Sequence, residues 1–137
     1  MRRTGILLVT LLLVTGACAA PPSDTTEAPT LNAELSDFKI ILDRASVPAG
    51  HIVLGIRNHA AMTHEVKVIR TDVAPDKLPI DGGTAKVQED GKAGELLNIG
   101  GGASRKLVLD LAPGSYVVLC NIAGHYQLGM RAGLEVK

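Results

Sequence analysis

The stretch Cys120-Asn-Ile-Ala-Gly-His125-Tyr-Gln-Leu-Gly-Met130 places a thiol, an imidazole and a thioether at even spacing, with four residues between neighbours. Gly124 and Gly129 each precede one of these candidate ligands, at positions where a glycine lets the backbone bend. Sulfur and imidazole ligands favour copper, zinc or iron over calcium or magnesium. The stretch therefore predicts a transition-metal site close to the C-terminus, with a fourth ligand supplied from elsewhere in the chain.

His64 is the candidate for the fourth ligand, because strand periodicity places it on an apolar face. Read as a strand, residues 64–70 put His64 on the same face as Val66 and Val68. The same alternation puts Cys120 in phase with Tyr116 and Val118, and Met130 in phase with Ala132, Leu134 and Val136. We therefore expect three ligands at strand ends and His125 on the loop between the last two strands.

Two histidines and one cysteine in a trigonal plane, with a weak axial methionine, form the ligand set of a blue-copper electron-transfer site. In Asn58…His64, followed by Cys-x4-His-x4-Met, the chain resembles the cupredoxin (blue copper) family. The run Leu111-Ala-Pro-Gly-Ser-Tyr116-Val-Val-Leu-Cys120, then Gly124-His125-Tyr126 and Gly129-Met130, is similar to small bacterial cupredoxin-like proteins. The resemblance extends over residues 31–137.

The resemblance implies an exported one-electron carrier that is not an enzyme and that binds one copper ion, cycling between Cu(I) and Cu(II), in each chain. His64, Cys120 and His125 would be the strong ligands and Met130 the weak axial ligand. Met62 is a rival axial ligand, since it lies two residues before His64. Asn58 is expected to be a loop residue, and His51 and His59, beside turns, are expected to be surface residues.

Two other functions use the same residues. One is copper binding for periplasmic copper delivery or buffering, without obligatory electron transfer. The other is a metalloenzyme with zinc or copper at Cys/His/His and an open fourth position. The enzyme is disfavoured because Met130 would occupy the open position and no general base is committed to the site.

Partners are expected to be redox proteins that dock transiently near His125. In cupredoxins the histidine of this loop reaches the surface through an apolar patch, and the matching residues here are Ala61, Met62, Ala123, Gly124 and Leu128. Such redox encounters are small. A monomer is expected, and no nucleic-acid partner, because the chain has neither a basic patch nor an aromatic platform.

The strand pattern predicts an all-β fold, a Greek-key antiparallel β-sandwich of seven to eight strands. Six stretches alternate clearly, and Val87 and residues 96–99 add weaker candidates; the six are 37–42, 52–57, 64–70, 106–111, 115–120 and 131–136. Tyr116, after the turn Ala112-Pro113-Gly114, is placed like the tyrosine corner of such sandwiches. Residues 71–102 are the least regular, with room for one short helix within 71–90.

Residues 1–17 are predicted to be a signal peptide: Arg2 and Arg3 precede an apolar run too short to span a membrane. Thr15-Gly16-Ala17-Cys18 resembles a lipoprotein signal, with Cys18 lipidated, and the alternative is cleavage after Ala19. Residues 18–32, rich in Pro, Ser, Thr and Ala, are predicted to be a flexible linker, and residues 33–137 the copper-binding domain. The protein is then in the bacterial cell envelope through its lipid anchor, or periplasmic or extracellular if cleaved.

Cysteine usage supports the metal site. Cys18 and Cys120 are the two cysteines of the chain, and export removes or lipidates the first. The mature domain then has one thiol and no intrachain disulfide. A buried structural cysteine is the simpler explanation, but His125 and Met130 at these spacings make metal ligation the better one.

Overall fold

Apolar side chains that recur at every second residue build the longer of the eleven strands in residues 25–137, the part of the chain that the computed structural model describes. The predicted signal peptide and Cys18 lie outside this part. The strands are β1 (Leu31–Ser36), β2 (Lys39–Leu42), β3 (Ser46–Val47), β4 (Gly50–Asn58), β5 (His64–Arg70), β6 (Ile80–Asp81), β7 (Lys86–Val87), β8 (Lys92–Ile99), β9 (Ser104–Leu111), β10 (Gly114–Leu119) and β11 (Arg131–Val136).

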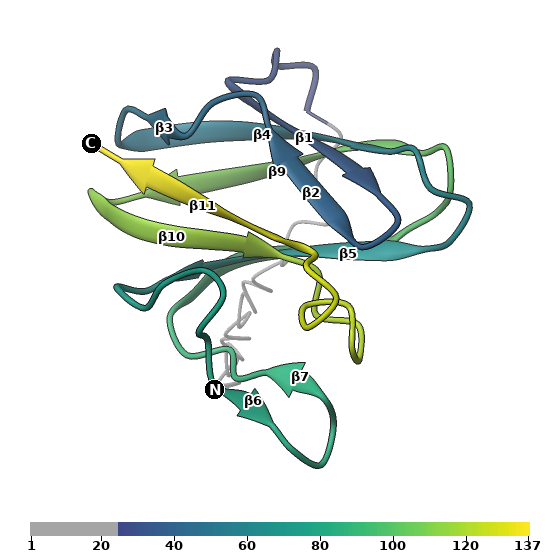
Figure 1. The fold of residues 1–137 in the computed structure, drawn as a ribbon. Helices are drawn as coiled ribbons and strands as arrows, with labels where there is room; N and C mark the ends of the chain where they lie inside the picture. The colour runs from purple at the N-terminus through teal and green to yellow at the C-terminus, as the bar shows by residue number, and fades with distance from the viewer. Residues whose placement is uncertain (1–24) are drawn as a thin grey trace, which may run out of the picture.

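Two sheets face each other and form a β-sandwich (Figure 1). One sheet has the strand order β2-β1-β4-β9, and the other has the order β3-β11-β10-β5-β8. The predicted all-β sandwich is confirmed. It is not purely antiparallel, because β1 pairs with β4 and β3 pairs with β11 in parallel.

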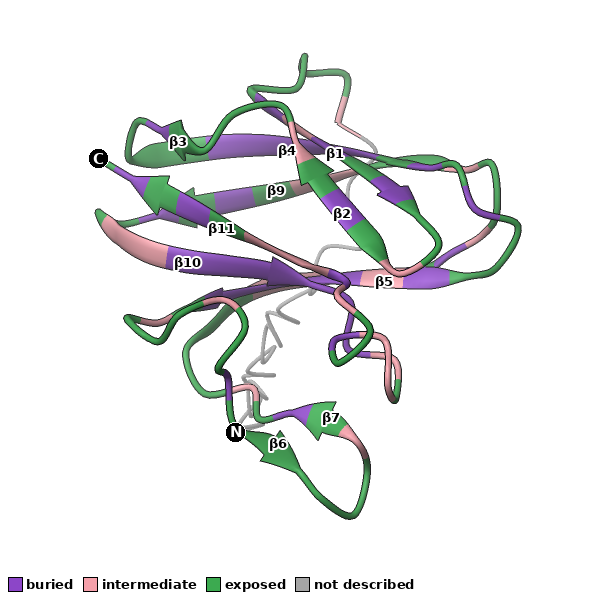
Figure 2. Cartoon of the chain, in the orientation of Figure 1, coloured by how far each residue is buried: buried purple, intermediate pink, exposed green. Residues whose placement is uncertain are grey.

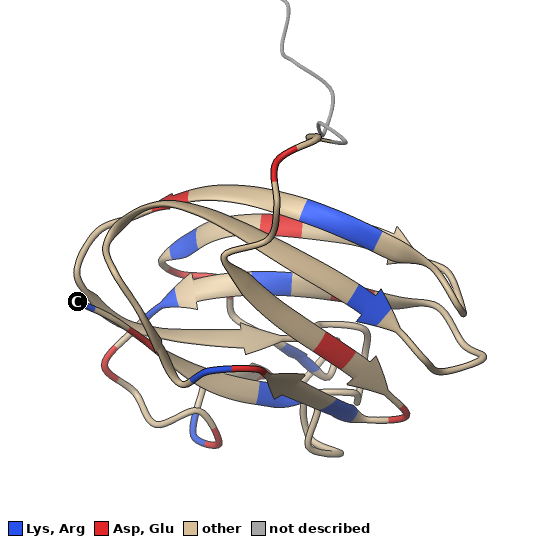
Figure 3. Cartoon of the chain, turned by 90° about the horizontal axis from the view of Figure 1, so that it is seen from above, with Lys and Arg blue, Asp and Glu red and all other residues tan. Residues whose placement is uncertain are grey.

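The main core lies between the two sheets, where the strand centres are buried (Figure 2). Leu54 of β4 and Val68 of β5 are fully buried there, as alternation predicts. The hydroxyl of Tyr116 donates a hydrogen bond to the carbonyl of Ala112 at 2.9 Å, which is the predicted tyrosine corner. Basic and acidic residues are interspersed over the strands in the view from above (Figure 3).

Three short or early strands escaped the sequence prediction. β1 begins at Leu31, so two residues of the predicted linker belong to the first strand. β3 and β6 contain two residues each, too few to show a period. Within the predicted strand 37–42, Asp37 and Phe38 instead form the turn before β2, and Phe38 has a φ of 56°.

Residues 71–90 hold no helix; they form turns and the small sheet of β6 and β7. This segment lies against the outer face of the five-stranded sheet, below β10 and β5 in Figure 1. It forms a second apolar cluster with that face, made of Ile69, Leu78, Val87, Val117, Leu119 and Tyr126. β5 and β10 are therefore covered on both faces, which explains why Ile69 and Lys67 are buried beside the expected Val66 and Val68.

The described residues of the predicted linker contact the domain. Lys106 Nζ on β9 donates hydrogen bonds to the carbonyl oxygens of Thr25, at 3.0 Å, and Glu27, at 2.5 Å. Thr30 N–H donates to the carbonyl of Val53 at 2.9 Å. Within residues 25–137, no helix is long and apolar enough to cross a membrane.

Candidate metal centre

The four predicted ligands lie where two strands end and two begin. His64 is the first residue of β5, Cys120 directly follows β10, and Met130 directly precedes β11. His125 is carried by the connection between β10 and β11, residues 120–130, which we call the copper loop. Gly124 and Gly129 have φ values of 82° and 112°, so the loop bends at the two predicted glycines.

Three donor atoms converge at one point. One ligand atom each from His64, Cys120 and His125 lies within 4.8 Å of the other two. Cys120 Sγ is 3.4 Å from His125 Nδ1 and 3.9 Å from His64 Nδ1. The two imidazole rings stand at 67° to one another, with their centroids 5.2 Å apart. Each histidine therefore presents Nδ1 to the sulfur, and the set of one thiolate and two imidazoles fits a copper ion.

Met130 is the buried methionine at this site. It is 0 % exposed, whereas the rival Met62 is 41 % exposed. The Met130 N–H donates to the carbonyl of His125 at 3.1 Å, and its carbonyl accepts from the N–H of Cys120 at 3.0 Å. Backbone pairing thus joins Met130 to both loop ligands, and burial favours Met130 over Met62 as the fourth ligand.

Burial changes the pKa values of His64 and Cys120 in opposite directions. Burial, and after it the nearby His125, lowers the pKa of His64, which keeps this imidazole neutral and able to bind a metal. Burial raises the pKa of the Cys120 thiol, and backbone hydrogen bonds to Glu65 and Ile122 oppose part of that shift. Without a metal the sulfur therefore keeps its proton at neutral pH, and metal binding has to displace it.

Phe38 is a site residue that sequence reasoning missed. Its ring packs edge to face on His125, with centroids 5.2 Å apart and an interplanar angle of 86°. It reaches the histidine from the turn between β1 and β2, which is distant in sequence. The pair Asp37-Phe38 could have been interpreted as a turn. The apolar alternation of Phe38 with Ile40 favoured a strand instead.

Asn58 fixes the segment that leads to His64, and it is the last residue of β4 and not the loop residue that the sequence predicted. It is buried at the end of β4, where its Nδ2 donates to the carbonyls of Met62 and Ile99, both at 2.9 Å. Its Oδ1 accepts the N–H of Ala60 at 3.0 Å. The amide therefore fixes the loop that leads into β5.

His51 and His59 are surface residues paired with acids, as expected. His51 Nε2 lies 3.0 Å from Glu27, and His59 lies beside Glu34. Tyr126, the residue after His125, lies in the interior instead. It is buried, and its hydroxyl binds backbone groups of residues 75–78.

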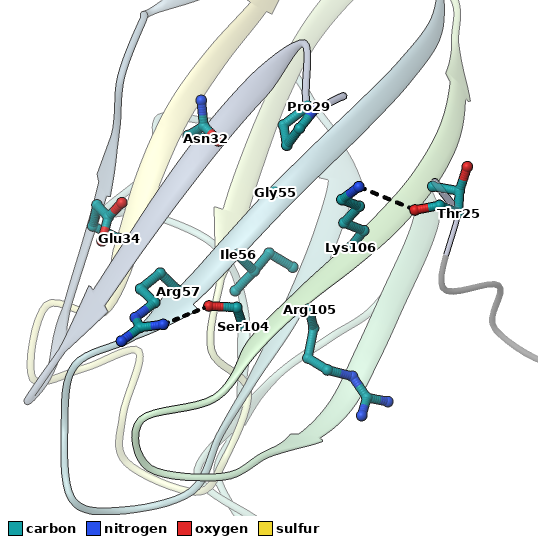
Figure 4. Close-up of a pocket in the computed structure, with 10 residues that line it drawn as sticks. All are labelled: Thr25, Pro29, Asn32, Glu34, Gly55, Ile56, Arg57, Ser104, Arg105 and Lys106. Carbon is teal, nitrogen blue, oxygen red and sulfur yellow. Dashed lines mark hydrogen bonds between the residues drawn. The ribbon is translucent and has the colours of Figure 1, made fainter. Parts of the chain in front are cut away.

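A cavity of 290 Å³ lies on the outer face of the four-stranded sheet, and none of the ligands lines it. Figure 4 shows Arg57 bonded to Ser104 and Lys106 bonded to Thr25 at this place. The remaining lining residues are Pro29, Asn32, Glu34, Gly55, Ile56 and Arg105. The metal centre instead lies between the copper loop, the start of β5 and the turn that carries Phe38.

Solved structures of blue copper proteins share this fold. Auracyanin from Roseiflexus castenholzii is 22 % identical over 77 % of this chain and 94 % of its own, with a TM-score of 0.59. Auracyanin A from Chloroflexus aurantiacus is 19 % identical over 77 % of this chain and 98 % of its own, with a TM-score of 0.52. Rusticyanin from Thiobacillus ferrooxidans is 14 % identical over 77 % and 76 %, with a TM-score of 0.59.

At the level of sequence, a search of curated proteins found no match. Residues 31–137, however, match the sulfocyanin (SoxE) domain. The matched range begins at β1, ends at the last residue, and contains all four predicted ligands. The donor set, the sandwich and this match agree, and the chain belongs to the sulfocyanin (SoxE) domain family of cupredoxin-like blue copper electron carriers.

Proposed function

We propose that this protein carries single electrons between redox proteins of the cell envelope, with the electron entering and leaving through His125. The observation that carries this is the convergence of Cys120 Sγ with the Nδ1 atoms of His64 and His125. A bound copper ion would supply the one-electron Cu(I)/Cu(II) couple. Burial of His64, Cys120 and Met130 excludes water and keeps the surroundings apolar, which favours a carrier over a site that releases its metal.

His125 supports a role as the electron port because it is the only partly exposed member of the four ligands. Apolar residues surround it in sequence and in the neighbouring loop: Ala61, Met62, Ala123 and Leu128 are exposed. The two large side chains of this set, Leu128 and Met62, are 62 % and 41 % exposed. An apolar surface of this kind suits brief docking by a redox partner of similar character.

The first prediction tests the metal centre. Adding Cu(II) to the purified protein should produce an intense visible band from the thiolate–copper bond, and Cys120→Ser should abolish it. The serine oxygen is a poor replacement for a soft thiolate. A matched control is His51→Gln, a surface histidine that lies outside the site and should leave the band unchanged. A wild-type protein that stays colourless with excess Cu(II) would reject the blue copper assignment.

The second prediction concerns export. We propose that Cys18 is lipidated and that the protein is anchored on the outer side of a membrane, because Thr15-Gly16-Ala17-Cys18 follows an apolar run. The protein should then fractionate with membranes, and Cys18→Ala should release or mislocalise it. Mass spectrometry of the mature N-terminus decides: a diacylated Cys18 supports the anchor, and a chain that begins at Ala20 contradicts it.

A further inference from the structure

Residues 75–89 cover the outer face of the five-stranded sheet next to the copper loop. We call them the covering segment. The side chains of Leu78 and Val87 pack there with Ile69 of β5 and Leu119 of β10, and all of these are buried. Tyr126 of the copper loop is part of the same cluster. Figure 1 shows β6 and β7 and the copper loop projecting from the same side of β10 and β5.

Tyr126 joins the copper loop to the start of the covering segment. Its hydroxyl donates a hydrogen bond to the carbonyl of Pro75 at 2.7 Å and accepts one from the N–H of Leu78 at 2.9 Å. On the loop side, Arg131 Nη1 donates to the Tyr126 carbonyl at 2.6 Å, and its guanidinium lies 5.0 Å from the Tyr126 ring centroid. The residue directly after the ligand His125 is therefore fixed by both its backbone and its side chain.

Asn121 makes the same kind of connection directly after the ligand Cys120. Its Oδ1 accepts the N–H of Val87 at 2.7 Å, and its Nδ2 donates to the Val87 carbonyl at 3.0 Å. The side chain thus pairs with β7 as a neighbouring strand would. Nδ2 also lies 3.0 Å from Glu89 Oε1. Asn121 is 1 % exposed, so water cannot easily replace these bonds.

The middle of the copper loop has two further bonds to the turn between β6 and β7. Gly124 N–H donates to the carbonyl of Ala85 at 3.0 Å, and Gln127 Nε2 donates to the same carbonyl at 3.2 Å. The copper loop is therefore hydrogen-bonded to the covering segment at residues 121, 124, 126 and 127, on both sides of His125.

The covering segment is itself anchored at its far end. Glu89 lies 2.8 Å from Lys67 Nζ of β5 and 2.8 Å from Lys92 Nζ of β8. Lys67 also pairs with Glu95 at 2.6 Å and is buried. The segment is held on the sheet by the ion pairs of Glu89 and by the packing of Leu78 and Val87. It can therefore restrict the motion of the copper loop that is hydrogen-bonded to it.

We propose that the covering segment is a brace that holds the copper loop in its ligating geometry, with Asn121 and Tyr126 as the positioning residues for Cys120 and His125. The proposal rests on the copper carrier function above and adds to it. An electron carrier works quickly when its ligands move little between the Cu(I) and Cu(II) states. A copper loop that is restrained by the covering segment keeps its ligands in nearly the same positions in both states. The brace also limits opening of the loop, the route by which copper would leave.

Tyr126→Phe removes only the phenol oxygen that bonds the copper loop to the covering segment, so it tests the brace. Tyr116→Phe is the matched control. Both tyrosines are 3 % exposed, and each loses a hydroxyl that binds a backbone carbonyl. Hydrogen exchange of the metal-free full chain should show at least about tenfold faster exchange of amides in residues 120–130 for Tyr126→Phe, since loop opening sets that rate. Tyr116→Phe should leave the loop's exchange unchanged.

Copper affinity is a second measurement that tests the brace. With a Cu(I) chelator in competition, Tyr126→Phe and Asn121→Ala should lose copper affinity by about 10- to 100-fold, the usual effect of removing a group that orients a ligand. Tyr116→Phe should bind as the wild type does. Equal losses in both tyrosine variants, or unchanged loop exchange in Tyr126→Phe and Asn121→Ala, would overturn the brace. A wild type that binds no copper would instead reject the carrier function, while the metal-free exchange comparison still decides the brace.

Discussion

At the scale of single residues, the site depends on which side chains are buried and which are left at the surface. His64, Cys120 and Met130 are buried, and His125 is partly exposed, with the ring of Phe38 packed edge to face against it. Burial keeps His64 neutral and the cysteine protonated until a metal arrives. The same enclosure leaves His125 as the one candidate ligand that is partly exposed.

The third prediction concerns Met130. Met130→Leu removes axial donation to Cu(II) and keeps the site apolar, so the reduction potential should rise; Met130→Gln offers an oxygen donor, so the potential should fall. Each shift should be about 60 mV or more, since 59 mV corresponds to ~1.4 kcal/mol for a one-electron couple. The leucine variant should lose less than about 1.5 kcal/mol of stability, because the volumes are similar.

Voltammetry of the wild type and both Met130 variants measures these shifts, and Met62→Leu is the control. Met62 is exposed, so its replacement should leave the potential nearly unchanged. If leucine and glutamine at 130 move the potential in the same direction, or if Met62→Leu moves it more than either, Met130 is not the axial ligand.

At the scale of elements, the loops at this end of the sandwich position the ligands by backbone contact. The turn between β8 and β9 packs under the loop that leads from Asn58 to His64. A Cβ at Gly101 would lie 2.5 Å from the carbonyl oxygen of Ala61, whereas one at Gly100 would meet nothing within 4 Å. Two neighbouring glycines of one turn therefore differ sharply in how much space they leave.

The fourth prediction uses this difference. Gly101→Ala should force the loop before His64 away from the turn and lower stability by about 1–3 kcal/mol, the usual result of overpacking. It should also weaken copper binding, because the displaced loop carries His64. Gly100→Ala, in open space, should be nearly neutral in both respects. Chemical denaturation and copper titration of the two variants measure this, and similar behaviour of both would show that the close approach at Gly101 is not a constraint.

At the scale of the whole molecule, two ionised carboxylates, one at each main sheet, are each held by several partners. Glu89 connects the covering segment to β5 and β8, and Asp43 binds Asn32 and Arg44 at the edge of the other sheet. Burial opposes ionisation of both carboxyls, but hydrogen bonds from these partners prevail and bring each pKa to about 2. Both groups therefore favour the folded state while they are ionised.

The fifth prediction is the acid dependence that results. A carboxyl whose pKa is lower in the folded state stabilises the protein above its unfolded pKa, and this stabilisation is lost as the pH falls through the folded value. For Glu89 the window runs from about 4.5 down to about 2. Glu89→Gln should be less stable than the wild type at neutral pH and should show a flatter decline within that window.

Denaturation of metal-free protein between pH 2 and 6 measures the effect without interference from the ligands. Asp72→Asn is the control, since Asp72 is exposed. If Glu89→Gln and the wild type lose stability in parallel across the window, the ion pairs of Glu89 do not contribute to folding.

The sequence by itself determined the candidate ligands, the all-β architecture and the bounds of two strands. Periodicity of two identified β5 and β11 to the residue, because each has a buried face with an uninterrupted apolar pattern. The spacing Cys-x4-His-x4-Met needed no tertiary knowledge, since one connection between two neighbouring strands carries all three residues. His64 followed from phase, because a ligand at a strand end must point toward the core.

Only the tertiary structure decided what surrounds those ligands. Phe38, Asn121 and Tyr126 act through partners at least 32 residues away, on elements that are too short or too irregular to show a period. The covering segment shows no regular period in the sequence because its apolar residues, Leu78 and Val87, are isolated. They are buried because a second face of β5 and β10 lies opposite them, and that face exists only once the sheet has formed.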